Sequence, residues 1–220
     1  MDLKERFLQH CLKFSENRNL IENLWLKIEK KHSEKGRFYH NLDHLENMFL
    51  ELEAVKDQIL NYTAITFSVF YHDIIYDATS RSNEEKSAEF AVSRLEELNI
   101  DQAIIKEVFE QILATKTHQI SNHHDTNYLL DADLSILGKD PETYRDYTKK
   151  IRKEYSFYPD LLYKPGRKKF SSIFWNWKAS LKRTILNQNT KNRQKKIFNL
   201  SLITYKVRFW IKPNCVNKKT

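Results

Sequence analysis

The chain has 220 residues, of which 40% are hydrophobic and 13% aromatic, enough for one domain with a buried core. Only 3 Gly and 4 Pro are present, which favours long helices over a turn-rich sheet. The two cysteines, Cys11 and Cys215, have no metal-binding or redox spacing, so a reducing compartment is expected. The first ten residues are charged, and no apolar run reaches the length of a membrane span. These features predict a cytoplasmic protein without membrane contact.

The net charge of +8 is distributed unevenly along the chain. All 29 acidic residues precede position 168, and residues 168–220 contain 14 of the 37 Lys and Arg residues. The sequence therefore predicts an acidic domain over 1–167 that is joined to a basic tail over 168–220.

Apolar residues recur at spacings of three and four, which is typical of amphipathic helices packed around a core. Asn41 is an expected N-cap, and Ser82 to Glu85 has the spacing of a capping box. Residues 58–75 are apolar nearly all round, which predicts a buried central helix. Ser121 to Asn127 reads as a polar loop with two solvated histidines. The fold class is all-α, with helices expected over 2–14, 16–31, 41–55, 58–75, 82–98, 101–118, 126–138 and 141–155.

Two strong metal ligands, His72 and Asp73, stand at the end of the apolar segment. A buried pair of this kind is unfavourable unless it is paired or binds a metal. A matching ligand, His44, is expected in the first turn of the helix that begins near Asn41. A last ligand is expected from Asp133, in the string DADLS.

Asp131 and Asp133 are two positions apart, so their side chains diverge on a helix and only one can join the site. Asp131 could instead hold a neighbouring helix or histidine. The ordered set is His44, His72, Asp73 and one of these two aspartates, with His40 close to His44 in sequence.

This set resembles the HD-domain superfamily of metal-dependent phosphohydrolases, which is named for the adjacent His-Asp pair. The string YHNLDH resembles the first site motif of cyclic-nucleotide phosphodiesterases, and ADLS resembles the segment with their last metal-binding Asp. The strings YHN, FYHDIIYD, SNEEKSA, DADLSILG, IRKEY and GR resemble a small bacterial subgroup of HD phosphohydrolases. The resemblance covers about residues 1–167 and implies an HD-domain-like helical bundle with a metal site between central helices. It also selects Asp133 over Asp131 and gives His40 the role of acid for the leaving oxygen.

Two imidazoles and two carboxylates suit a divalent metal that also binds water. We expect one or two ions per chain, from Mn, Fe, Mg, Zn, Co or Ni, with Asp73 as a bridge if there are two. A metal-bound hydroxide would then hydrolyse a small phosphorylated substrate, either a phosphomonoester or a phosphodiester of a nucleotide or similar metabolite. His40 and Asp73 are the expected catalytic residues.

Further residues have both a functional and a structural interpretation. Three arginines could contact phosphate or form surface ion pairs: Arg37, Arg152 and Arg167. His118 could bind a second metal or phosphate. Glu84 and Glu85 suit either a helix cap or a supporting position behind the ligands.

Two other functions fit the same residues. One is a di-iron oxygenase, because some proteins with this fold and ligand set carry out that chemistry. The other is a non-catalytic module that binds a nucleotide, or binds nucleic acid through the basic tail.

The tail itself has two interpretations. Its Lys and Arg residues, with Trp175, Trp177 and Trp210, suit a nucleic-acid-binding arm. Alternatively, a frameshift near Lys168 produced it, since permitted codons for residues 174–178 read one base earlier encode Phe-Leu-Glu-Leu-Glu. We favour the frameshift, because that alternative frame restores acidic residues and a helical apolar stripe.

Overall fold

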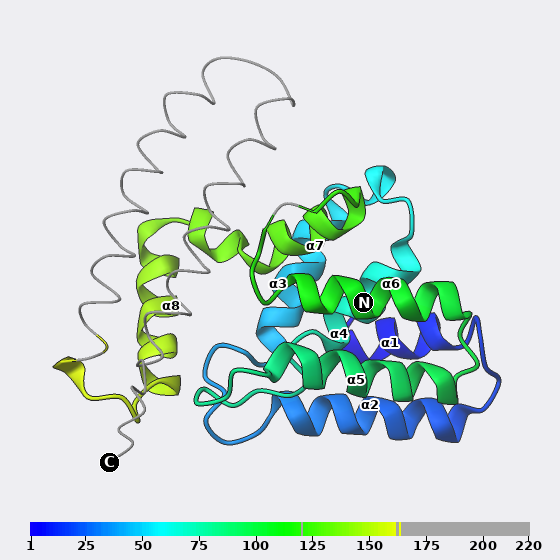
Figure 1. The fold of residues 1–220 in the computed structure, drawn as a ribbon, viewed down its shortest axis with the longest axis horizontal. Coiled ribbons are helices and arrows are strands. Elements are labelled where there is room, and N and C mark those ends of the chain that lie inside the picture. Colours follow the sequence, from blue (N-terminus) through cyan, green and yellow to red (C-terminus); the bar gives the residue numbers. More distant parts are fainter. Residues whose placement is uncertain (120, 162, 164–220) are drawn as a thin grey trace, which may run out of the picture. The chain divides into compact units, whose positions relative to one another are not determined.

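The computed structural model describes residues 1–119, 121–161 and 163. These residues are all-helical, with eight α-helices, two short 3-10 helices and no strand among them (Figure 1). The elements are α1 (Leu3–Cys11), α2 (Arg18–His32), α3 (Leu42–Glu53), η1 (Lys56–Gln58), α4 (Tyr62–Tyr71), α5 (Asn83–Glu97), α6 (Gln102–Ala114), α7 (His124–Asp133), η2 (Ser135–Gly138) and α8 (Pro141–Glu154). The predicted all-α class is confirmed.

The chain separates into two compact units. The first contains residues 1–116 and 121–154 and includes all ten helical elements. The second contains 117–119 and the described residues from Tyr155 onward. The predicted boundary near residue 167 and the basic tail lie outside the described residues.

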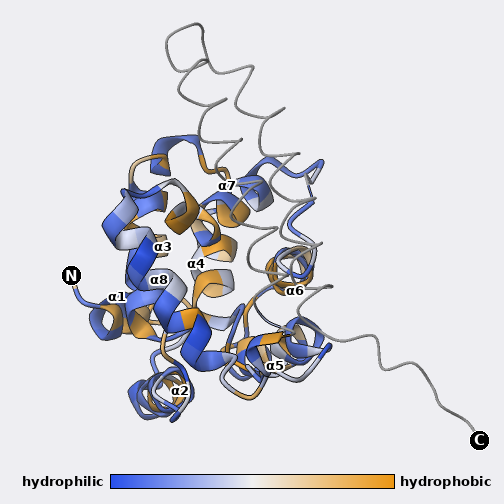
Figure 2. Ribbon diagram, turned by 90° about the vertical axis from the view of Figure 1, so that its left-hand side faces the viewer, coloured by the Kyte–Doolittle hydropathy of each residue, from blue (hydrophilic) through white to orange (hydrophobic). Residues whose placement is uncertain are grey.

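Helix α4 is the centre of the first unit, as its sequence predicts. Every residue from Ala64 to Tyr71 is buried, and the helix packs against α3, α5, α6 and α7. Figure 2 shows its hydrophobic colour in the middle of the bundle. The Phe70 ring contacts Phe7 of α1, Trp25 of α2 and Phe49 of α3, with ring centroids 5.1, 6.4 and 5.0 Å away. The end of α4 is therefore held from several sides.

Side-chain caps set the starts of several helices. Asn41 caps α3, as predicted, and its side chain accepts a hydrogen bond from His44 N. Asn61 caps α4 by accepting from Ala64 N at 3.1 Å, so the helix starts at Tyr62 rather than near residue 58. Asp101 caps α6 in the same way through Ala103 N.

Helix α5 agrees with the predicted range 82–98, but its predicted capping box and other predicted helix boundaries were wrong for local reasons. Ser82 precedes α5 but makes no side-chain cap hydrogen bond, while Asn83 pairs with the backbone of Asp77 instead. The expected polar loop at 121–127 is shorter, because α7 already begins at His124. The predicted helix 126–138 also changes to a 3-10 helix after Asp133.

Among the described residues, none of the helices combines the length and apolar character needed to cross a membrane.

Candidate metal centre

The first candidate ligand is placed by the start of α3. The Asn41 cap fixes the first turn, in which His44 lies, and the His44 side chain is buried. Its ring is packed against Tyr39, with centroids 5.0 Å apart. The imidazole is thus directed by both a backbone cap and an aromatic neighbour.

The end of α4 places the second and third ligands. His72 is the C-cap residue, and its backbone N–H donates to Ser68 O. The ring atom Nδ1 lies 2.9 Å from Val69 O, so a proton on Nδ1 donates to this carbonyl. Nε2 is then the nitrogen available to a metal, which is the usual arrangement for a metal-binding histidine. Asp73 follows directly and is also buried.

The fourth ligand comes from α7, whose last residue is Asp133. Its Oδ1 atom lies 3.1 Å from His44 Nε2 and 3.9 Å from His72 Nε2. Leu129, Leu130 and Ala132 of the same helix are buried and anchor it in the core. Within the described residues, the group that could hold a metal ion contains His44, His72 and Asp133.

The ligand atoms of His44, His72 and Asp133 lie close together, and Asp73 lies beside His72. His44 Nε2 and His72 Nε2 are 3.3 Å apart, and Asp73 Oδ2 lies 3.3 Å from His72 Nε2. Ligand bonds of about 2.0–2.1 Å at tetrahedral or octahedral angles place neighbouring ligand atoms roughly 3.0–3.4 Å apart. The ligand atoms of His44, His72 and Asp133 all lie within 4.8 Å of one another. The spacing and the mixture of nitrogen and oxygen atoms therefore fit a divalent metal ion.

The electrostatics of the cluster also favour a cation. Burial lowers the pKa of His72, but the charges of Asp73 and Asp133 outweigh it and raise the pKa to about 9. Burial by itself raises the pKa of Asp73, yet the charge and hydrogen bond of His72 hold it well below its usual range. Burial also lowers the pKa of His44, despite the neighbouring Asp133 carboxylate. Two carboxylates thus create a strongly negative position that a positive charge must compensate.

A histidine–glutamate pair lies beside this cluster. His40 Nδ1 is 2.7 Å from Glu154 Oε2, and His40 Nε2 is 4.0 Å from Asp73 Oδ2. The His40 ring stacks on Tyr76 at a centroid distance of 4.4 Å. His40 therefore has one nitrogen on a carboxylate and the other toward the candidate ligands.

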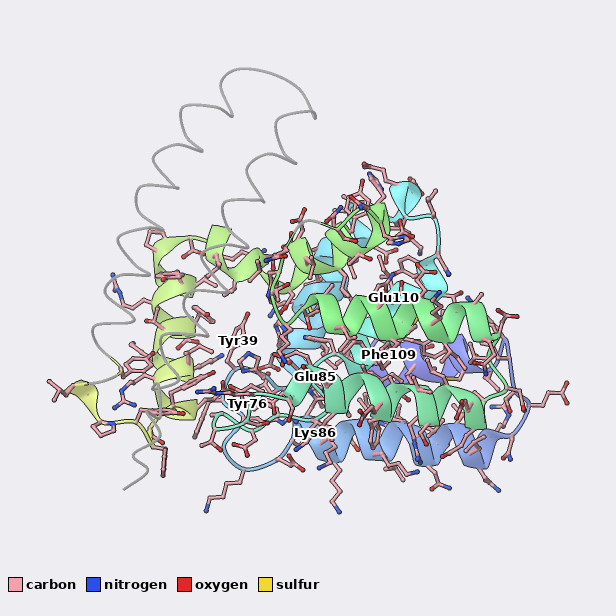
Figure 3. All side chains as sticks on the ribbon, viewed as in Figure 1. Tyr39, Tyr76, Glu85, Lys86, Phe109 and Glu110 are labelled. Carbon is pink, nitrogen blue, oxygen red and sulfur yellow. The ribbon has the colours of Figure 1, made fainter. Side chains whose placement is uncertain are left out.

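Glu154, the last residue of α8, accepts four hydrogen bonds. Oε1 accepts from Tyr39 N at 2.7 Å and His40 N at 3.0 Å. Oε2 accepts from Tyr76 OH at 2.9 Å and faces His40 Nδ1. Burial raises its pKa, but His40 and these hydrogen bonds lower it to about 2. Figure 3 shows Tyr39 and Tyr76 on the side of the bundle that faces α8.

The sequence analysis did not select Glu154. The residue lies within the string IRKEY, but this segment is separated from His40 by more than one hundred residues. Its local sequence, a glutamate at the end of a polar helix, does not indicate that the carboxylate is buried against His40.

The remaining predicted residues have different surroundings. Arg37 is buried and donates to the backbone carbonyls of His40, Asp73 and Ile74, so the predicted surface ion pair was wrong for this residue. Glu84 is buried, whereas Glu85 forms an ion pair with Lys116. His118 belongs to the second unit and is buried, and Arg152 is half-buried on α8. Arg167 lies outside the described residues.

Comparison of the chain with protein-family models, curated proteins and solved structures found no match.

Proposed function

We propose that this chain is a metal-dependent phosphohydrolase of the HD type that acts in the cytoplasm. Its substrate is a phosphomonoester or phosphodiester of a nucleotide or similar small metabolite. The observation that carries the proposal is the buried cluster of His44, His72 and Asp133, with Asp73 beside it. The His40–Glu154 pair adjoins this cluster and supplies the acid that phosphoester cleavage requires.

His44, His72, Asp73 and Asp133 would hold the ion. A bound divalent metal acts as a Lewis acid on a phosphoryl oxygen and lowers the pKa of bound water. The buried protein groups fix the ligand positions before the substrate arrives, so little reorganisation accompanies the reaction.

Hydrolysis forms a bond from a water oxygen to phosphorus and breaks the bond from phosphorus to the leaving oxygen. His40 Nε2 donates a proton to the leaving oxygen, which leaves His40 neutral. Glu154 remains a carboxylate and holds the Nδ1 proton, so that the ring keeps Nε2 directed toward the cluster. Asp73 would accept the proton released by the water, and its Oδ2 atom lies 4.0 Å from His40 Nε2, to which that proton then returns.

The test is metal content measured by elemental analysis at known protein concentration. Purified wild-type chain is offered Mn, Fe, Mg, Zn, Co and Ni in turn, beside His72→Ala and a matched control, His123→Ala. His123 is exposed, so this variant also loses an imidazole but leaves the cluster intact. We expect about one or two ions per chain in wild type and control, and far less in His72→Ala.

The loaded protein is then assayed with p-nitrophenyl phosphate and bis(p-nitrophenyl) phosphate. Hydrolysis that depends on both metal and His72 supports the proposal. Absence of metal binding by folded wild type rejects it. Iron content with oxygen consumption, and without hydrolysis, would identify an oxygenase instead.

A further inference from the structure

The guanidinium of Arg37 is buried between the two segments that carry His40 and Asp73. Nη1 donates to Asp73 O at 2.6 Å and to His40 O at 3.2 Å. Nη2 donates to Ile74 O at 2.9 Å. One side chain therefore joins the backbone of the segment before α3 to the backbone that follows α4.

The carbonyls of Asp73 and Ile74 need hydrogen-bond donors because they lie beyond the end of α4 and these residues are buried. Asp73 and Ile74 are 2% and 0% exposed, and α4 ends at Tyr71. Backbone carbonyls in such positions lack an intrahelical partner and are destabilising when left unpaired. A planar guanidinium presents several N–H groups in a fixed fork, so it can serve successive carbonyls together.

The surroundings of Arg37 hold the fork in place and leave it little access to a substrate. Its side chain is 3% exposed. His32 Nδ1 lies 3.5 Å from Nη1, and the Tyr76 ring lies against the guanidinium at 5.4 Å. Both Nη atoms face protein acceptors, so their direction is toward the backbone of the site.

We propose that Arg37 is a positioning residue for the metal centre. Its fork fixes the backbone of Asp73 relative to that of His40, and thereby the distance between the ligand cluster and the histidine that donates the proton. This inference rests on the proposed function for the presence of a metal. The positioning role itself concerns only Arg37 and the backbone that it contacts. Groups that orient metal ligands typically change metal affinity about 10–100-fold when removed.

The experiment measures Mn²⁺ affinity of the full chain by isothermal titration calorimetry. Arg37→Gln removes the fork and the charge, and Arg37→Lys keeps the charge without the planar fork. Arg94→Gln is the matched control. Like Arg37, Arg94 lies over an aromatic ring, here that of Phe90, and it pairs with the carboxylate of Glu97. All titrations are made where circular dichroism shows each protein to be fully folded.

We expect Mn²⁺ to bind Arg37→Gln about 10–100-fold more weakly than wild type, and Arg94→Gln as tightly as wild type. Arg37→Lys should fall between them, because an ammonium reproduces the charge but not the fork. If Arg37→Gln does not fold, a tenfold loss of Mn²⁺ affinity in Arg37→Lys supports the positioning role. Wild-type affinity in folded Arg37 variants overturns the inference. If wild type does not bind Mn²⁺, the titration uses whichever of the six metals it does bind, and absence of binding of all six rejects the metal function itself.

Discussion

At the scale of single residues, Glu154 determines how His40 is held. One carboxylate oxygen accepts the backbone N–H groups of Tyr39 and His40, and the other faces the His40 ring. Glu154→Gln keeps an oxygen for the backbone groups but places an amide N–H₂ opposite Nδ1. We expect phosphodiesterase activity to fall about a hundredfold or more, because general acid catalysis contributes about 10²–10⁴. The measurement is kcat on bis(p-nitrophenyl) phosphate with the metal-loaded protein.

Metal content separates this effect from loss of the cluster. Glu154 contacts His40 and Tyr76 but is outside the candidate ligand group, so Glu154→Gln should retain its metal. Glu142→Gln on the same helix is the control, since Glu142 is exposed in the first turn of α8. Equal kcat values for the two variants would exclude an orienting role for Glu154.

The sequence allowed some of these residues to be predicted and not others. His72 and Asp73 are recognisable because they interrupt a buried apolar pattern, and Asp133 follows from helical direction together with a motif. The contacts of Glu154 and the carbonyls held by Arg37 join segments far apart in the chain. Local periodicity has no information on such pairs, which depend on how the helices pack.

At the scale of elements, α4 was predictable as a buried helix, but its ends were not. An apolar run indicates burial on all sides and does not mark where helical hydrogen bonds stop. Asn61 sets the start through its side chain, and the end changes to a turn in which Ile74 N donates to Tyr71 O. Such local hydrogen bonds, in which a side chain competes with the backbone, shift the ends of a helix by a few residues.

The packing of α1 on α4 gives a pH-dependent prediction. His10 of α1 is buried with its ring 4.8 Å from that of Phe67, and burial lowers its pKa to about 4. Between pH 6.5 and pH 4 the unfolded chain therefore binds more protons at this position than the folded chain. The free energy of unfolding should decrease as the pH falls, by ~2 kcal/mol from pH 8 to pH 5 through His10.

The contribution of His10 is isolated by urea unfolding of wild type and His10→Leu at both pH values. His32, whose pKa burial lowers to about 3, titrates in both proteins, so its contribution cancels in the comparison. We expect the wild type to lose ~2 kcal/mol more than the variant between these pH values. A pH dependence that is the same in both proteins would show that His10 remains neutral in the unfolded chain or charged in the folded one.

At the scale of the whole molecule, composition predicted the helical class but not the division of the described chain. The scarcity of Gly and Pro agrees with the all-helical structure, and the acidic and basic segments were separable by counting. The first compact unit, however, ends at Glu154 and excludes residues 117–119, a discontinuity that no composition change marks. A change in amino-acid composition along the chain shows where the charge of the chain changes. Compact units are instead defined by contacts between distant segments.

The candidate metal centre connects α3, the end of α4 and α7, so ion binding there should stabilise this unit as a whole. The unfolded chain separates His44, His72 and Asp133, and an ion that binds only the folded arrangement adds its binding free energy to folding. At a free Mn²⁺ concentration of about 100 times Kd the gain is about 2.7 kcal/mol, or roughly 5–10 °C in Tm. Thermal unfolding followed by circular dichroism over a Mn²⁺ titration measures it. His72→Ala should show no such rise in Tm, because this variant keeps the carboxylates of Asp73 and Asp133 but lacks the imidazole between them. A wild-type Tm that is independent of Mn²⁺, Zn²⁺ and Fe²⁺ would mean that His72 and the carboxylates compensate one another's charges without an ion.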